Sequence, residues 1–180
     1  IFPAVVAMAG GKPGDERSAR FAHGEEKAFP GYYAVRLPAD DILVELTASP
    51  RAGVHRYTFP MGTKPHLILD VCSVLGNKRS EKGSVTVLPD ASEVEGSVRI
   101  YGSFSGRYDG LDVYFVARFD QAFANFGTWN GEVFSADQAT AEGDDVVIVG
   151  SDGRRRLVCE IRQLTEGRAP PEVAKRCVVS

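Results

Sequence analysis

The sequence lacks features that are typical of several common protein classes, and each missing feature argues against one kind of function. Among its 180 residues, no apolar run approaches the roughly 20 residues that a membrane helix needs. The three cysteines form no Cys-x-x-Cys pair and no cluster with histidine, so no zinc site is predicted. A formal net charge of -3 provides no broad attraction for nucleic acid or for an acidic membrane. We therefore expect neither nucleic acid nor a membrane as a partner.

Familiar catalytic motifs are also missing. The chain has no G-x-S-x-G elbow, P-loop, H-E-x-x-H motif or dinucleotide fingerprint. Its three histidines lie far apart in the sequence. His55 falls within a predicted strand, where a structural hydrogen bond is favoured over catalysis. His66 follows a proline at the start of another predicted strand and is expected to be exposed.

What is present is typical of a globular β-protein. Hydrophobic residues make up 43% and charged residues 25% of the chain, and 19 glycines with 10 prolines suit many turns. No helical period is sustained, apart from a turn or two that residues 172–176 could form. We expect one β-sandwich domain over residues 1–180, in which residues 166–180 are a loosely attached tail.

Alternating apolar and polar residues predict the strands. The pattern is clearest at residues 32–37, 42–47 and 53–59, which short turns connect into an antiparallel meander. Further strands are predicted at residues 66–75, 84–88, 93–101, 111–119, 146–149 and 156–161, and residues 1–9 could form another. Such a series of short strands without intervening helices predicts an all-β fold, an antiparallel β-sandwich with few or no helices.

The ends of the chain and its cysteines bear on its origin. It begins with Ile1, and residues 1–10 lack the charged leader and cleavage pattern of a signal peptide, so we expect an excised or processed piece. Cys72 lies in a predicted strand and is expected to be a buried thiol. Cys159 and Cys177 leave two alternatives, a disulfide in a secreted protein or separate thiols.

Two groups of residues are candidates for binding. His23, Glu25 and Glu26 place an imidazole and two carboxylates on one loop, which could contact a polyol or a cation or move a proton. Trp129 lies among glycines and polar residues, where its ring could stack on a sugar. For each group the alternative is structural: a solvated loop for the first, and a tryptophan that seals the sandwich for the second.

Several motifs, in their order and spacing, resemble the N-terminal β-sandwich domain of family 92 glycoside hydrolases, the calcium-dependent exo-acting α-mannosidases. The matching segments are FAHGEE at 21–26, PGYYAV at 30–35, ELTA at 45–48, HRYTFP at 55–60, YFVARF at 114–119 and FGTW at 126–129. The chain departs from the family where AHGEE at 22–26 replaces the usual SHENE, and the similarity fades beyond residue 149.

The resemblance implies a sandwich of the supersandwich type and a larger parent enzyme. In this family the catalytic carboxylates of an inverting mechanism and the calcium site lie on a following (α/α) barrel domain. We therefore expect no catalytic residue, metal ligand or cofactor in this chain, and no activity from the chain alone. The resemblance also implies a secreted or extracytoplasmic location, and mannose-containing glycans as the parent's ligands.

Three functions follow as alternatives. The chain is an accessory domain that packs on the catalytic barrel and helps to shape the mannose pocket, with His23, Glu25, Glu26 and Trp129 as its substrate-binding candidates. It is otherwise an autonomous carbohydrate-binding module, or a structural interaction domain without sugar contact. Separated from the barrel, the domain is expected to self-associate through the exposed inter-domain face.

Overall fold

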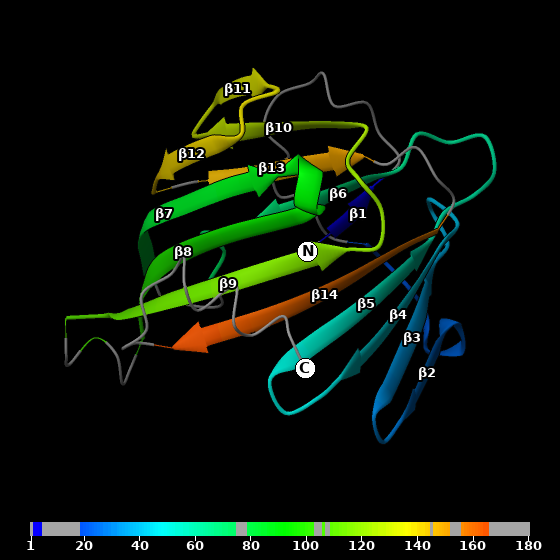
Figure 1. Cartoon of the computed structure of the whole chain (residues 1–180). Coiled ribbons are helices and arrows are strands. Elements are labelled where there is room, and N and C mark those ends of the chain that lie inside the picture. Colours follow the sequence, from blue (N-terminus) through cyan, green and yellow to red (C-terminus); the bar gives the residue numbers. More distant parts are fainter. Residues whose placement is uncertain are drawn as a thin grey trace.

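The protein has an all-β fold built from two sheets (Figure 1). The computed structural model describes residues 2–4, 19–74, 79–102, 106, 109–144, 146–151 and 156–165. Every strand pair described in these residues is antiparallel. Helical structure among them is limited to short 3-10 turns, which include η1 (His23–Glu25) and η2 (Pro89–Ala91). The predicted fold class is confirmed.

The larger sheet has nine strands in the order β12-β7-β8-β9-β14-β5-β4-β3-β2. Their bounds are β2 (Glu26–Phe29), β3 (Tyr32–Leu37), β4 (Ile42–Ala48), β5 (Ala52–Thr58), β7 (Arg79–Leu88), β8 (Glu93–Tyr101), β9 (Leu111–Phe119), β12 (Thr140–Gly143) and β14 (Arg156–Thr165). Strand β14 lies between β9 and β5 and thereby joins two meanders that are separate in sequence.

The smaller sheet has five strands in the order β1-β6-β13-β10-β11. Their bounds are β1 (Phe2–Ala4), β6 (His66–Asp70), β10 (Asn125–Asn130), β11 (Val133–Ala136) and β13 (Val146–Ser151). Figure 1 shows these strands in the upper part of the molecule, near β12 and β7 of the nine-stranded sheet, whose β5 to β2 end extends away to the lower right. The smaller sheet therefore covers only part of the larger one.

The core lies between the sheets and follows the period of two along each strand. Val35, Val44 and Tyr57 belong to one buried cluster and stand on one face of β3, β4 and β5. The cluster also contains Leu67 of β6, which belongs to the five-stranded sheet. We call the face of the nine-stranded sheet that carries these residues the inner face.

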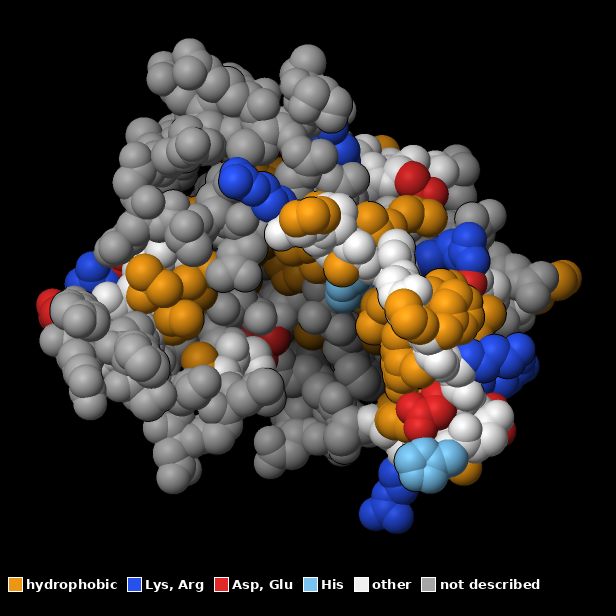
Figure 2. All heavy atoms as spheres, turned by 90° about the horizontal axis from the view of Figure 1, so that it is seen from below, with side chains coloured by type: hydrophobic (Ala, Val, Ile, Leu, Met, Phe, Trp, Pro, Cys, Tyr) orange, Lys and Arg blue, Asp and Glu red, His pale blue; other side chains and the backbone are white. Residues whose placement is uncertain are grey.

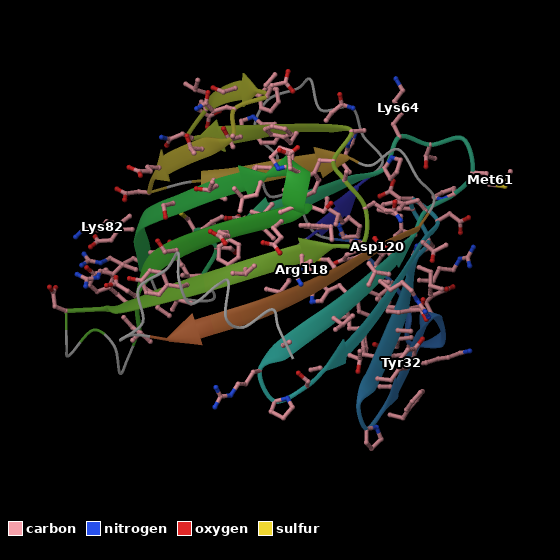
Figure 3. The ribbon with its side chains drawn as sticks, in the orientation of Figure 1. Tyr32, Met61, Lys64, Lys82, Arg118 and Asp120 are labelled. Carbon is pink, nitrogen blue, oxygen red and sulfur yellow. The ribbon has the colours of Figure 1, made fainter. Side chains whose placement is uncertain are left out.

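The opposite, outer face carries ion pairs between neighbouring strands. Arg99 Nε donates to Asp112 Oδ1 at 2.7 Å, and Arg118 pairs with Glu93. At the far end of the sheet, Tyr32 donates its hydroxyl to Glu45 Oε1 at 2.8 Å. Arg118 and Tyr32 are labelled in Figure 3. Charge pairs of this kind suit a solvated sheet surface.

Most strand predictions are confirmed, and their bounds show where pattern reasoning was wrong. The strands at 32–37, 93–101 and 111–119 begin and end as predicted. The strand predicted at 66–75 ends at Asp70, whereas β7 begins at Arg79, before the predicted start at residue 84. Strand β7 contains an irregularity between Glu81 and Ser84, which disturbs the alternation there. The predicted tail at 166–180 lies outside the described residues.

Four strands were not predicted: β2, β10, β11 and β12. Three of them are only four residues long, so too few positions alternate to give a signal. The sequence of β10 indicates only an aromatic, glycine-containing stretch. Its Gly127 explains part of that composition, because a Cβ there would lie 2.5 Å from Phe134 Cζ. The glycine is required for the close approach of the Phe134 ring on β11.

Candidate functional site

The predicted His23 loop forms a hydrogen-bonded group with a tyrosine that sequence reasoning did not single out. His23 lies in η1, and Glu26 begins the edge strand β2. His23 Nδ1 is 2.6 Å from Glu26 Oε1, and the Tyr33 hydroxyl donates to Glu26 Oε2 at 2.8 Å. Glu26 stands directly opposite Val35, so its side chain lies on the inner-face side of β2. Glu25 is exposed.

These hydrogen bonds favour the ionised form of Glu26. The contact with His23, followed by the contact with Tyr33, lowers the pKa of the Glu26 carboxyl below its ordinary value. The same contact raises the pKa of Tyr33, chiefly because only the neutral phenol can donate this hydrogen bond to Glu26. The group thus presents a fixed anion, with a neutral tyrosine between it and the rest of the inner face.

The inner face becomes more open towards the end of the sheet where Tyr33 stands. Along β4, Ile42 and Val44 are buried, Leu46 is partly buried and Ala48 is exposed. Strands β3 and β5 show the same gradient in the same direction, since their partly buried members at that end are Tyr33 and His55. Polar side chains therefore collect where the five-stranded sheet no longer covers the core.

His55 is the second polar group at this end. Its Nδ1 is 2.7 Å from the Tyr57 hydroxyl, which confirms the expected structural hydrogen bond. Burial lowers the pKa of His55, so its ring is neutral at pH 7. Burial also raises the pKa of Tyr57, the side chain that fixes the orientation of the imidazole.

Trp129 lies far from this group. It stands on β10 in the five-stranded sheet, is 2% exposed, and has its ring centre 4.7 Å from that of Phe134. Its indole N–H is buried without a hydrogen-bond partner among the residues that the structure describes. A ring so enclosed offers no face to a sugar, and this burial fits the structural alternative rather than stacking.

Two other sequence predictions can be checked. His66 is 8% exposed, so the expectation that it is exposed was wrong: it begins β6, which is paired on both sides by β1 and β13. Cys72 is buried, as expected, and so is Cys159, whereas Cys177 lies outside the described residues. Within the described ranges, no group of three or more His, Cys, Asp or Glu side chains could hold a metal ion.

Comparison with known protein families shows which family the chain belongs to. The model of the glycosyl hydrolase family 92 N-terminal domain matches residues 1–151. The chain belongs to this family. The match covers most of the chain and includes the His23 loop, β3 to β5 and β10, the segments whose motifs resembled the family.

Solved structures of family 92 enzymes share the fold. The inverting mannosidase BT2199 from Bacteroides thetaiotaomicron VPI-5482 superposes with a TM-score of 0.74 at 22% identity, over 89% of this chain and 21% of that one. The α-mannosidase BT3965 from Bacteroides thetaiotaomicron gives 0.71 at 20% identity, over 83% and 21%. The glycosyl hydrolase ccman5 gives 0.69 at 27% identity, over 85% and 22%. The chain thus spans about a fifth of the length of these enzymes.

No curated protein sequence matches the chain. In the part of the chain that the structure describes, no helix has the length and apolar character needed to cross a membrane.

The family 92 domain therefore places its candidate residues in two locations. The His23 loop meets Tyr33, which lies on the same face of the nine-stranded sheet as His55, whereas Trp129 belongs to the other sheet. Sequence reasoning did not group Tyr33 with His55, because each occupies an ordinary alternating strand position. Only the pairing of β2, β3, β4 and β5 brings them to one open end of the core.

Proposed function

We propose that the chain is the N-terminal accessory domain of an α-mannosidase, which packs on the catalytic domain and helps to shape its mannose pocket. The family match over residues 1–151 supports this role most directly, together with the similar fold in mannosidases about four times as long. The domain's own contribution to the pocket would come from the His23 loop, with Glu26 held in place by two hydrogen bonds.

The catalytic steps belong, in this proposal, to the missing domain. An inverting glycosidase needs an acid that protonates the leaving oxygen and a carboxylate that activates water on the other side of the sugar. Calcium would be bound by the same missing domain. A mannosidase that acts on external glycans would work outside the cytoplasm, and we extend that location to this chain.

The decisive experiment reconstitutes the two parts. The reading frame is first followed downstream to a helical region with acidic residues, which is then expressed with and without residues 1–180. We expect α-mannosidase activity with calcium only when both parts are present, on one chain or as two co-purifying pieces. Activity of the 180-residue chain alone, or full activity of the helical region alone, would contradict the proposal.

Separated from that partner, the 180-residue chain should self-associate through the uncovered inter-domain face. Exposed Phe21 and Phe29, at 47% and 60%, lie before and on β2 and are suited to such a contact. Light scattering should detect the association. A monomer that binds no hydrophobic dye would show that this face does not associate.

A further inference from the structure

The open end of the inner face carries a row of three side chains on adjacent strands. Tyr33 of β3 stands directly opposite Leu46 of β4, which in turn stands opposite His55 of β5. Because neighbouring strands are about 4.8 Å apart, the polar ends of the row are separated by about 10 Å across the apolar Leu46. All three side chains are partly buried, so they are neither sealed in the core nor fully solvated.

Each polar end of the row is fixed by one hydrogen bond and has a second position that can form another. The Tyr33 hydroxyl donates to Glu26, so its oxygen can still accept a hydrogen bond from a ligand. His55 binds Tyr57 through Nδ1, which directs Nε2 to the other side of the ring. There it borders Gly53, where even a Cβ would lie 3.7 Å from Nε2. Since Gly53 has no side chain, there is room beside this nitrogen.

The chemistry of the row selects a class of ligand. An anion would be repelled by the ionised Glu26. A metal ion would need more ligands, and no group of three suitable side chains occurs in the described residues. A purely apolar ligand would not pair with the acceptor position of the Tyr33 hydroxyl or with Nε2 of His55. A neutral polyol remains, whose hydroxyls can pair with both ends of the row while its C–H groups pack on Leu46.

The surroundings are compatible with such a ligand. Figure 2 views the molecule from below and shows hydrophobic side chains gathered on the side where β2 to β4 lie, with acidic and histidine side chains beside them. The surface is hollowed next to this group. Mixed apolar and hydrogen-bonding walls of this kind are typical of ligand sites.

We propose that Tyr33, Leu46 and His55, together with Glu26, form a saccharide-binding row on the inner face of the nine-stranded sheet. This inference rests on the proposed function, because mannose is the sugar it implies. It adds His55 and Tyr33 as direct sugar contacts and requires no role for Trp129.

The test is a titration of the 180-residue chain with mannose, observed by NMR at the imidazole C–H signals. The three histidines are assigned by substitution. We expect the His55 signal to shift with saturation, whereas the signal of buried His66 on the other sheet stays unchanged. A His55 signal that stays fixed up to about 100 mM mannose, where a dissociation constant near 10 mM would be evident, would overturn the inference.

A matched pair of variants tests the hydroxyl. Tyr32 and Tyr33 are neighbours on β3, and each donates to a glutamate at 2.8 Å, but Tyr32 does so on the outer face. Y33F should weaken mannose binding about three- to tenfold, the usual effect of one neutral hydrogen bond, and Y32F should leave it unchanged. Equal effects of the two variants would place the sugar elsewhere.

A second variant blocks the space beside His55 without removing any hydrogen-bonding group. A valine at residue 53 would fill the room beside His55 Nε2 and suits a strand position. G53V should abolish the His55 shift while the unfolding transition remains cooperative; an unchanged shift would overturn the inference.

The two proposals fail in different ways. If the two-part enzyme is active but the His55 signal never shifts, the saccharide-binding row is wrong and the proposed function stands. If the His55 signal shifts with saturation but the two parts never assemble into an active enzyme, the row binds sugar and the proposed function is wrong.

Discussion

Replacing Trp129 separates a core tryptophan from a sugar platform. The side chain is 2% exposed and packs on Phe134. Truncating an aromatic side chain so deeply buried removes its packing and leaves a cavity, and such changes cost about 3–5 kcal/mol. W129A should therefore lose a large part of the folding free energy, which is about 5–15 kcal/mol for a typical domain.

W129F provides the matched control. Phenylalanine retains much of the ring contact and removes the indole N–H, which is buried without a partner. An unsatisfied buried donor costs about 1–3 kcal/mol, so its removal offsets part of the lost packing. We expect W129F to change the unfolding free energy by less than about 1.5 kcal/mol.

Urea denaturation followed by far-UV circular dichroism measures both variants, since both lack the only tryptophan. In the wild-type chain, the tryptophan emission should resist quenching by iodide and should not respond to mannose. A loss below about 1 kcal/mol in W129A would refute the core assignment, because a buried Trp-to-Ala change costs several times more. A saturable response of the emission to mannose would equally refute it.

Two further predictions concern stability. G96A should lower the free energy of unfolding in urea by about 1–3 kcal/mol, because a Cβ there would lie 2.6 Å from the Phe115 ring and 2.5 Å from a backbone oxygen. G24A is the control and should be neutral, because a Cβ at residue 24 would have nothing within 4 Å. Equal stability of the two variants would contradict the packing at Gly96. Burial lowers the pKa of His66 in the folded chain. As the pH falls below about 6.5, the unfolded chain therefore binds a proton at His66 before the folded chain does. The free energy of unfolding should decrease with falling pH until the pH drops below the folded pKa of His66. H66L should be more stable by about 1 kcal/mol, because both ring nitrogens of His66 are buried without hydrogen-bond partners in the described part of the chain. It should also reduce this pH slope, as measured by urea midpoints at several pH values. An unchanged slope would show that His66 does not titrate in this range.

Much of the fold was readable from local sequence because long strands carry many alternating positions. Residues 93–101 and 111–119 alternate over nine residues each, and their bounds were predicted correctly. Short edge strands such as β2 and β12 carry too few positions to stand out. The apolar run after His66 predicted too long a strand, because Val71 and Cys72 enter the core from a bend rather than from a strand.

The candidate site was only partly readable. The sequence placed His23, Glu25 and Glu26 on one loop, and the structure links two of them directly. It could not show that Tyr33 completes the group, because that depends on the register of β2 against β3. Nor could it show that Trp129 is enclosed, because glycines around a tryptophan accompany both an open loop and a close ring contact.

The sequence by itself determined the all-β class, the main strands and the family, since alternation and motif order are properties of neighbouring residues. Tertiary structure decided everything that depends on long-range pairing. Strand β14 reaches its place between β9 and β5 from the far end of the chain, and the five-stranded sheet covers one end of the larger sheet and leaves the other open. That uneven cover, which no local pattern encodes, exposes Tyr33 and His55 where their strand positions alone would predict core.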